Sequence, residues 1–352
     1  MIETTELERY LEDATDLRSA LGIPPDAPLR LTPIGQGEYN ANYRFTHPGT
    51  GRELVLRVNV GSQMHLPDQI GYEYRALRLL EPSGRTPRAH YVDGSLARLP
   101  YGVLIMDFLP GRPLVYETDL PLAARVLADI HAVPVPGDSR LVRPEDPLRA
   151  IVAECREMFA VYTASVYAEA RTVATIARLV RRAGELAAGG AGGGGHGGAG
   201  GGGSRGGTPG QRHLISTELN SGNFLINSPT GHDYLVDWEK PVLGEIEQDL
   251  AHFLAPTTTL WKTDTILTRE QMGFFLAEYR AAVAGRFPTG GLEERFEQYL
   301  SITCLRGITW CAMAYVEYQD PGRALKNELT YEKIRLYVSP EFLETIEATY
   351  FG

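Results

Sequence analysis

An acid, an asparagine and a second acid, set around a short hairpin, constrain the fold of this chain more than any other feature. Asn223 follows Glu218 by five residues, and Asp237 comes after two short apolar runs separated by turn-forming residues. Two apolar runs around a turn predict a β-hairpin. The predicted strands and turn are Phe224–Ile226, Tyr234–Val236 and 228–231. This hairpin would carry an amide at its start and a carboxylate just past its end.

The spacing of these three side chains suits phosphoryl transfer. In kinase-type sites one carboxylate lies at the acceptor hydroxyl, while an amide and a second carboxylate bind the metal ions. Asn223 and Asp237 both offer hard oxygen atoms, which Mg²⁺ prefers. A surface loop can supply an acid and an asparagine by chance, but it rarely also supplies the hairpin and the second acid in order. We therefore expect Glu218, Asn223 and Asp237 to be catalytic, with Asn223 and Asp237 as metal ligands.

The order of the predicted elements indicates an α+β fold with two lobes. Helical periodicity covers residues 4–21 and 68–80, and the predicted strands of the first part are 31–34, 41–46, 53–58 and 103–106. The later periodic segments are helical: 120–131, 147–186, 268–284, 292–318 and 340–350. Strands first and helices later predict a small antiparallel β lobe and a larger helical lobe. The predicted parts are an N-terminal helix, an N-lobe and a C-lobe, at residues 1–28, 29–109 and 110–352.

The composition argues against several classes of protein. The 352 residues carry 34 basic and 44 acidic side chains, and the net charge of −10 argues against a nucleic-acid partner. This charge favours a cationic or neutral substrate, or serves solubility alone. The three cysteines lack metal-binding spacing and indicate reduced thiols in the cytoplasm. The start of the chain is too charged for a signal peptide, and no apolar run is long enough to span a membrane.

A glycine-rich tract at residues 189–210 interrupts the helical pattern. Glycine occupies 15 of its 22 positions. Such a tract buries too little side chain to offset the entropy of ordering it, so we expect a disordered surface loop. The tract also contains a Gly-x-Ser-x-Gly match around Ser204. That motif of serine hydrolases needs a strand before it and a helix after it, and neither is predicted here.

Further motifs lie in a consistent order along the chain. Residues 35–40 read Gly-Gln-Gly-Glu-Tyr-Asn between two predicted strands, Arg57 lies on a strand, and Glu73 lies on a helix. Residues 104–111 read Leu-Ile-Met-Asp-Phe-Leu-Pro-Gly, and 249–251 read Asp-Leu-Ala. Together with the hairpin, these motifs resemble the aminoglycoside phosphotransferase and choline kinase family, a branch of the protein-kinase-like fold, over roughly residues 30–350.

The resemblance implies ATP and Mg²⁺ as cofactors, and it indicates which residues bind the nucleotide. Glycines in the first hairpin let backbone N–H groups approach the phosphates closely. Arg57 stands where protein kinases have a lysine; its guanidinium can pair bidentately with phosphate oxygens, and Glu73 is its expected ion-pair partner. Backbone groups of Asp107 and Leu109 in the 104–111 segment would bind the adenine. The implied cofactor-binding residues are Gly35, Gly37, Asn40, Arg57, Glu73, Asp107 and Leu109.

The catalytic loop departs from the family pattern. The family has His-Gly-Asp where this chain has Ser216, Thr217 and Glu218. Glutamate carries its carboxylate about one bond length, ~1.5 Å, further out than aspartate. A displacement of that size can lower the rate about 100-fold if nothing else adjusts. A loop shaped around the longer side chain would avoid this loss. The family also implies that Asp249 braces the loop through backbone hydrogen bonds.

Three functions fit these residues. The first is an ATP-dependent phosphotransferase that moves the γ-phosphate to a hydroxyl of a small molecule, such as an amino alcohol, a sugar or an aminoglycoside-like compound. The second is a pseudokinase that binds a nucleotide with little or no transfer. The third is a non-enzymatic module that uses the cleft for another ligand. Asn223 and Asp237 favour the first two, because a scaffold without a metal has no physical need for both.

The acceptor itself does not follow from the sequence. Candidate lining groups in the helical lobe are Trp261, Trp310, Tyr315, Glu317 and Tyr318. Aromatic rings can stack on a quaternary amine, but aromatic residues at helical spacing more often form a core. We therefore expect a small-molecule substrate but do not name it, and the sequence does not indicate the oligomeric state.

Overall fold

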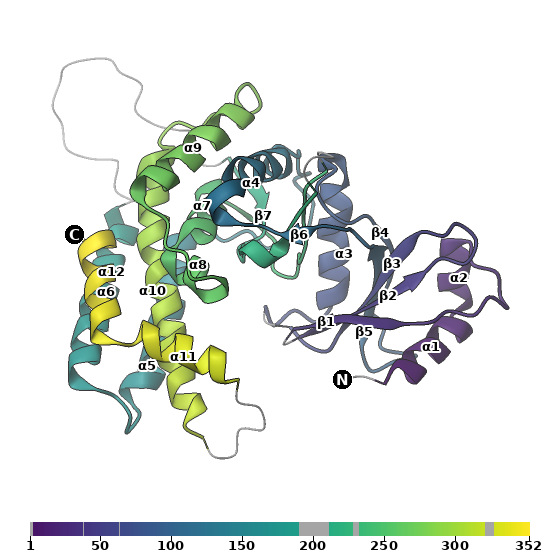
Figure 1. The fold of residues 1–352 in the computed structure, drawn as a ribbon, viewed down its shortest axis with the longest axis horizontal. Coiled ribbons are helices and arrows are strands. Elements are labelled where there is room, and N and C mark those ends of the chain that lie inside the picture. The colour runs from purple at the N-terminus through teal and green to yellow at the C-terminus, as the bar shows by residue number, and fades with distance from the viewer. Residues whose placement is uncertain (1–2, 38, 63, 190–210, 228–231, 321–326) are drawn as a thin grey trace. The chain divides into compact units, whose positions relative to one another are not determined.

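The computed structural model of the chain describes residues 3–37, 39–62, 64–189, 211–227, 232–320 and 327–352 (Figure 1). The chain falls into two compact units. The first comprises Met1–Val142 and Gly222–Val242, and the second comprises Arg143–Ser221 and Leu243–Gly352. The predicted lobe boundary between residues 109 and 110 separates a β-rich part from a helical part, whereas the two units group residues that contact one another. The lobe boundary stays a prediction.

Two helices begin the first unit, so the prediction of a single helix over residues 4–21 is wrong. α1 (Thr4–Asp13) ends at Ala14, whose backbone is not helical, and α2 (Thr15–Leu21) follows directly. The end of a helix leaves carbonyl groups without intrahelical donors. The buried Arg18 donates from Nε to the carbonyl of Leu11 at 2.8 Å. This side chain therefore stabilises the break.

A five-stranded antiparallel sheet, in the order β1-β2-β3-β5-β4, forms the centre of the first unit. Leu54, Leu56 and Val58 of β3 are buried in a core cluster with side chains of α1 and α2. Successive side chains of a strand point to opposite faces, so Arg57 lies on the other face. α3 packs against β4 and β5. The bounds are β1 (Thr32–Gln36), β2 (Asn40–Thr46), β3 (Glu53–Asn59), α3 (Gln69–Leu80), β4 (Ala89–Asp93) and β5 (Gly102–Asp107).

A second, three-stranded sheet of the first unit contains the predicted hairpin. Its order is β6-β8-β9, and Phe224 of β8 lies opposite Leu235 of β9. Gly111, at φ 150°, lies so close to Leu225 that an added Cβ would be 2.9 Å from the Leu225 carbonyl carbon, which requires glycine there. The predicted turn at 228–231 lies outside the described residues. The remaining bounds are η1 (Glu81–Ser83), β6 (Arg112–Pro113), α4 (Tyr116–His131), η2 (Ser221–Asn223), β8 (Phe224–Ile226) and β9 (Tyr234–Leu235).

The second unit is built around α10 (Leu292–Tyr318), which packs against six other helices: α5, α6, α7, α8, α11 and α12 (Figure 1). A helix surrounded in this way is apolar on most sides, and Ile302, Leu305 and Ile308 are fully buried. β7 (His213–Ile215) pairs with β10 (Val242–Gly244). The other bounds are α5 (Pro147–Thr163), α6 (Ala170–Gly189), α7 (Ile246–Leu254), α8 (Pro256–Lys262), α9 (Arg269–Val283), α11 (Glu328–Tyr337) and α12 (Pro340–Tyr350).

The helix predicted over 147–186 is also wrong, because α5 and α6 are separate. Ser165 lies in the connection; its hydroxyl donates to the carbonyl of Tyr162 at 2.8 Å and accepts from the amide of Tyr167 at 3.3 Å. Serine hydroxyls that bond to nearby backbone groups compete with the helix. The expected capping box at Thr268 and Gln271 is present at the start of α9. The short helices α7, α8 and α11 were not predicted.

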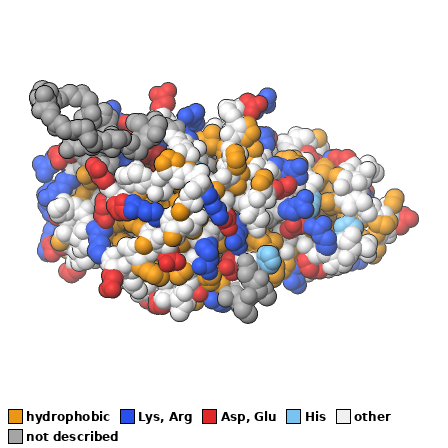
Figure 2. All heavy atoms as spheres, turned by 90° about the horizontal axis from the view of Figure 1, so that it is seen from above, with side chains coloured by type: hydrophobic (Ala, Val, Ile, Leu, Met, Phe, Trp, Pro, Cys, Tyr) orange, Lys and Arg blue, Asp and Glu red, His pale blue; other side chains and the backbone are white. Residues whose placement is uncertain are grey.

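The distribution of charged, apolar and cysteine side chains agrees with a folded globular chain. On the face shown in Figure 2, basic and acidic side chains are interspersed. Within the described part of the chain, no helix combines the length and apolar composition needed to cross a membrane. All three cysteines are buried and free. The glycine-rich tract lies outside the described residues, apart from Gly189 at the end of α6.

Candidate active site

A buried ion pair joins β3 to α3 in the first unit. Arg57 Nη1 lies 2.7 Å from Glu73 Oε1, and both side chains are almost completely buried. Burial acts to lower the pKa of Arg57, but the carboxylates of Glu73 and Asp237 outweigh it and raise the pKa above its ordinary value. Burial is also the largest influence on the Glu73 carboxyl and raises its pKa, which Arg57 opposes only in part. The guanidinium therefore provides a fixed positive charge.

The same guanidinium reaches the carboxylate that follows the hairpin. Arg57 Nη2 lies 3.0 Å from Asp237 Oδ1, and Arg57 Nε donates to Asn42 Oδ1 at 3.1 Å. The Asp237 side chain remains 40% exposed. Its backbone has φ 69°, a left-handed conformation that aspartate adopts more readily than most residues. Asp237 is thus oriented by Arg57 while part of its carboxylate stays accessible.

Asn223 lies next to Asp237 across the base of the hairpin. The carbonyl of Asn223 accepts a hydrogen bond from the amide of Val236 at 2.9 Å, which closes the hairpin one residue before Asp237. Both side chains are partly exposed. The hairpin predicted from the sequence thus brings the two proposed metal ligands together, although 14 positions separate them along the chain.

The glycine-rich turn precedes β2 in the same unit. Among the described residues, a Cβ at Gly35 would meet nothing within 4 Å, and at Gly37 it would meet only the carbonyl of Asn40 at 3.9 Å. The space beside both glycines is therefore open to a ligand. The side chain of Asn40, in contrast, is buried and bonded to protein groups on both sides, to Glu239 and to Asn59.

The backbone at the end of β5 is bonded within the first unit, and the adenine contact predicted for Asp107 and Leu109 stays a prediction. The amides of Asp107 and Phe108 donate to carbonyls of Arg88 and Glu53, at 3.0 and 3.2 Å. Asp107 Oδ1 accepts from Arg52 and His90. Burial raises the pKa of the Asp107 carboxyl, but His90 and Arg52 outweigh it and hold the pKa below its usual range. The side chain of Asp107 thus anchors the strand end, and the half-buried Leu109 follows it.

In the second unit, Asp249 holds the loop that carries Glu218. Asp249 is fully buried; its Oδ2 accepts from the amide of Ser216 at 2.9 Å and its Oδ1 from the amide of Thr217 at 2.7 Å. Thr217 has φ 68°. Two charge-assisted hydrogen bonds to consecutive amides can stabilise such a backbone. Asp249 therefore braces the loop, as the resemblance to the family implied.

Glu218 has neighbours in the second unit that the sequence analysis missed. The negative charge of Glu218 acts to raise the pKa values of His252 and Arg306. Nδ1 of His252 lies 2.9 Å from the carbonyl of Leu219, and burial, followed by the charge of Arg306, holds the pKa of His252 below its ordinary value. Arg306 forms a bidentate pair with Glu154, at 2.9 and 3.0 Å. The only available signal was the position of His252 directly after the Asp-Leu-Ala motif.

The candidate acceptor-binding aromatics contact other aromatic rings. Trp261 and Trp310 meet edge to face at 5.3 Å, and Tyr318 stacks on Tyr331 at 5.3 Å. Trp310 remains 37% exposed, whereas Tyr318 is buried. The arrangement favours packing over ligand binding for most of these rings.

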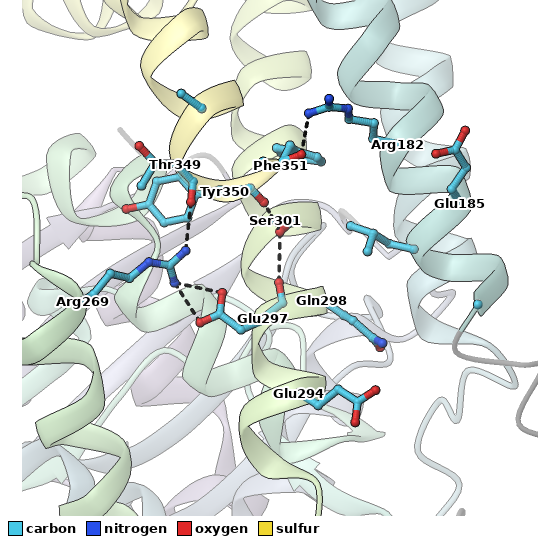
Figure 3. A pocket seen from close by; sticks show the side chains of 14 residues that line it. Arg182, Glu185, Arg269, Glu294, Glu297, Gln298, Ser301, Thr349, Tyr350 and Phe351 are labelled. Atoms are coloured by element: carbon cyan, nitrogen blue, oxygen red, sulfur yellow. Dashed lines mark hydrogen bonds and ion pairs between the residues drawn. The ribbon is translucent and has the colours of Figure 1, made fainter.

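The second unit also contains a cavity of about 900 Å³ that is separate from the predicted site residues (Figure 3). Its walls come from α6, α9, α10 and α12 and the residues after α12. Figure 3 shows Arg269 bonded to Glu297 and to the carbonyl of Thr349. None of the predicted site residues lines this cavity, so its size does not bear on their chemistry.

The side chains present fit a hard cation such as Mg²⁺. Within the described residues, no group of three or more His, Cys, Asp or Glu side chains forms a self-sufficient metal site. Mg²⁺ is commonly held by one or two protein oxygens together with water and substrate phosphates. The accessible carboxylate of Asp237 and the neighbouring Asn223 amide supply oxygens of this kind.

The sequence matches the model of one protein family over residues 30–288, described as the phosphotransferase enzyme family. The chain belongs to this family. The matched range includes the glycine-rich turn, the Arg57–Glu73 pair, the hairpin and Asp249. No curated protein matches the chain at the level required for comparison.

Solved structures place the phosphotransferase within the kinase-like fold. A spectinomycin phosphotransferase in complex with ADP and spectinomycin is 15% identical, with a TM-score of 0.60 and coverage of 99% of this chain and 98% of the other. An ethanolamine kinase from Plasmodium vivax is 12% identical, with a TM-score of 0.63 and coverage of 98% and 91%. A choline kinase from Cryptosporidium parvum is 12% identical, with a TM-score of 0.60 and coverage of 96% and 99%. These likenesses confirm the predicted α+β, kinase-like fold.

Proposed function

We propose that the chain is an ATP-dependent phosphotransferase that moves the γ-phosphate to a hydroxyl of a small molecule. The observation that carries this proposal is the position of Arg57, held between the buried Glu73 and the accessible Asp237. An arginine bonded to both acids supplies a fixed charge for phosphate and orients the carboxylate expected to bind the metal. Family membership supports the same reaction class.

The first unit supplies the nucleotide contacts. Asn223 and Asp237 would hold Mg²⁺, which would supply positive charge to the phosphate oxygens. Arg57 orients the phosphates, the open space beside Gly35 and Gly37 admits them, and the backbone around Asp107 and Leu109 binds the adenine. Asn40 supports the phosphate contact by holding the turn, because its buried amide is bonded to Glu239 and Asn59.

Glu218 acts on the acceptor. Its carboxylate orients the acceptor hydroxyl and takes its proton, as the hydroxyl oxygen bonds to the γ-phosphorus. The bond from that phosphorus to the β,γ-bridging oxygen of ATP breaks, and ADP leaves. Positioning and electrostatics provide most of the acceleration in such reactions. A glutamate on a loop braced by Asp249 therefore meets the requirement.

The acceptor class is an amino alcohol, a sugar or an aminoglycoside-like compound in the cytoplasm. The names of the structural neighbours support this range, because those proteins act on spectinomycin, ethanolamine and choline. No feature of the described residues selects among these acceptors.

Two measurements test the proposal. Mg²⁺ with ATP or ADP should raise the melting temperature of the protein, and Asp237→Ala should abolish the increase. Transfer of labelled γ-phosphate should then be detected with at least one compound of a panel of amino alcohols, sugars and aminoglycosides. Nucleotide binding without transfer to any of them would favour the pseudokinase. An unchanged melting temperature in wild type would contradict both.

A further inference from the structure

Glu239 connects the segment that carries Asp237 to the glycine-rich turn. Asn40 Nδ2 donates to Glu239 Oε2, although 199 positions separate the two residues. The carbonyl of Glu239 also accepts from Gln69 Nε2 of α3 at 2.6 Å. Between Asp237 and Glu239, the indole of Trp238 is 1% exposed and donates to the carbonyl of Leu235 at 3.1 Å. The segment is thus anchored in the first unit at each of its residues.

The orientation of Asn40 is fixed from its other end. Asn59 Nδ2 donates to Asn40 Oδ1 at 2.9 Å, so the amide nitrogen of Asn40 is the end that faces Glu239. The carbonyl of Asn40 accepts from the amide of Gly37 at 2.8 Å, which closes the glycine-rich turn. A continuous set of hydrogen bonds therefore runs from Gly37 through Asn40 to Glu239.

We propose that Glu239 is a positioning residue, which acts through Asn40 to fix the glycine-rich turn relative to the segment of Asp237. This inference rests on the proposed function. Asn40 is buried, and a hydrogen bond to a charged group in a buried place is stronger than one between neutral groups. Phosphate binding at the turn and metal binding at Asp237 then become coupled, since the same contact holds both in place.

The coupling predicts which ligands respond when the contact is lost. Binding of Mg²⁺–ADP uses both the turn and Asp237, whereas adenosine uses only the segment around Asp107 and Leu109. Loss of the Asn40–Glu239 contact should therefore weaken Mg²⁺–ADP binding about tenfold, as expected for one lost hydrogen bond to a charged group. Adenosine binding should change less than twofold. General loss of structure would weaken both ligands equally.

A reversal of donor and acceptor tests the contact itself. In Asn40→Asp, two carboxylates face each other and should repel. In Glu239→Gln alone, an acceptor remains for Asn40, so the effect should be small. In the double variant, the amide of the new glutamine can donate to the new aspartate, which also still accepts from Asn59. The dissociation constant of Mg²⁺–ADP in the double variant should return to within about threefold of wild type.

A second readout needs no ligand. Hydrogen–deuterium exchange of peptides that cover residues 32–46 should be about tenfold faster in Asn40→Asp than in wild type, and it should recover in the double variant. Glu53→Gln is the matched control. Glu53 is also a hydrogen-bonded acid, and it lies at the first residue of β3, whereas Asn59 lies at the last. This variant should leave exchange at Asn40 and both affinities unchanged.

The outcomes separate the inference from the proposed function. Recovery of exchange and affinity in the double variant supports the positioning role. Failure of the double variant to recover exchange overturns it. If Glu239→Gln weakens Mg²⁺–ADP as much as Asn40→Asp does, Glu239 acts at the ligand directly and the positioning role is also wrong. If wild type does not bind Mg²⁺–ADP, the proposed function fails, while exchange still decides the contact.

Discussion

The two regions that carry the proposed chemistry are stabilised in different ways. Around Arg57, charged side chains from β3, α3 and the segment after the hairpin bond directly to one another, and most of them are buried. Around Glu218, a single buried acid, Asp249, holds backbone amides. In the first region the identity of each side chain is fixed by its partners. In the second, the backbone before Glu218 is fixed by Asp249, and the proposal that a glutamate serves where the family has aspartate rests on this bracing.

The largest expected effect is on turnover when Glu218, the proposed catalytic base, is changed. Glu218→Gln keeps the size of the side chain but removes its charge and its ability to take a proton. Turnover should fall about 10²–10⁴-fold, the usual contribution of a general base, while the dissociation constant of Mg²⁺–ADP changes less than twofold. Steady-state kinetics with the best acceptor and calorimetric binding of Mg²⁺–ADP measure the two quantities.

Glu218→Asp is the companion variant for the length of the side chain. If the loop is shaped around glutamate, the shorter acid should also be slower than wild type. Wild-type turnover in both variants would show that another group positions the acceptor.

The next effect tests the region of paired charges. Arg57→Met leaves Glu73 buried without its partner, and such a loss typically lowers the free energy of unfolding by about 3–5 kcal/mol. Chemical denaturation monitored by circular dichroism measures the change. The double variant with Glu73→Met should recover much of it, because no buried charge is left unpaired. Equal losses in the single and double variants would show that the pair contributes little.

A smaller effect is expected where one acid holds the backbone. In Asp249→Asn, only one side-chain oxygen remains to accept from the amides of Ser216 and Thr217, and the new NH₂ group faces an N–H. The free energy of unfolding should fall by about 2–3 kcal/mol. Turnover should fall together with stability, whereas affinity for Mg²⁺–ADP should be nearly unchanged. A loss of nucleotide affinity as large as that of turnover would contradict the separation of the two regions.

The smallest effect depends on pH. Burial, and then the charge of Glu245, raises the pKa of the Glu247 carboxyl to about 7, against the opposing charges of Arg295 and Arg212. A carboxyl with a higher pKa in the folded state loses stability as pH rises from about 4.5 through 7, because the unfolded chain releases the proton first. Glu247→Gln removes this loss. Its stability relative to wild type should increase by about 1–2 kcal/mol between pH 5 and pH 8.

Denaturation curves at the two pH values measure this difference. Glu294→Gln on the exposed face of α10 is the control and should show no such dependence. If the free energies of unfolding of Glu247→Gln and wild type differ by the same amount at both pH values, the pKa of Glu247 is not raised.

The sequence predicted those parts of the site that depend on short spacings. Local spacing sufficed for the hairpin that brings Asn223 to Asp237, whereas the Arg57–Glu73 pair was expected only from the resemblance to the family. The Asn40–Glu239 contact, between residues 199 positions apart, follows only from the packed sheet. His252 and Arg306 were missed because only the packing of α7 and α10 brings them together. The breaks at Ala14 and Ser165 depend on side chains that bond to backbone carbonyls, which apolar periodicity does not detect.

The burial of all three cysteines has a practical consequence for labelling. Burial raises the pKa of Cys155 to about 12, and it also raises the pKa values of Cys304 and Cys311. Because the thiolate is the reactive form, maleimide dyes at neutral pH should leave the folded wild-type protein unmodified. A cysteine placed at Val166, which is 92% exposed between α5 and α6, would then be the single attachment point for a fluorophore, without prior removal of the native thiols.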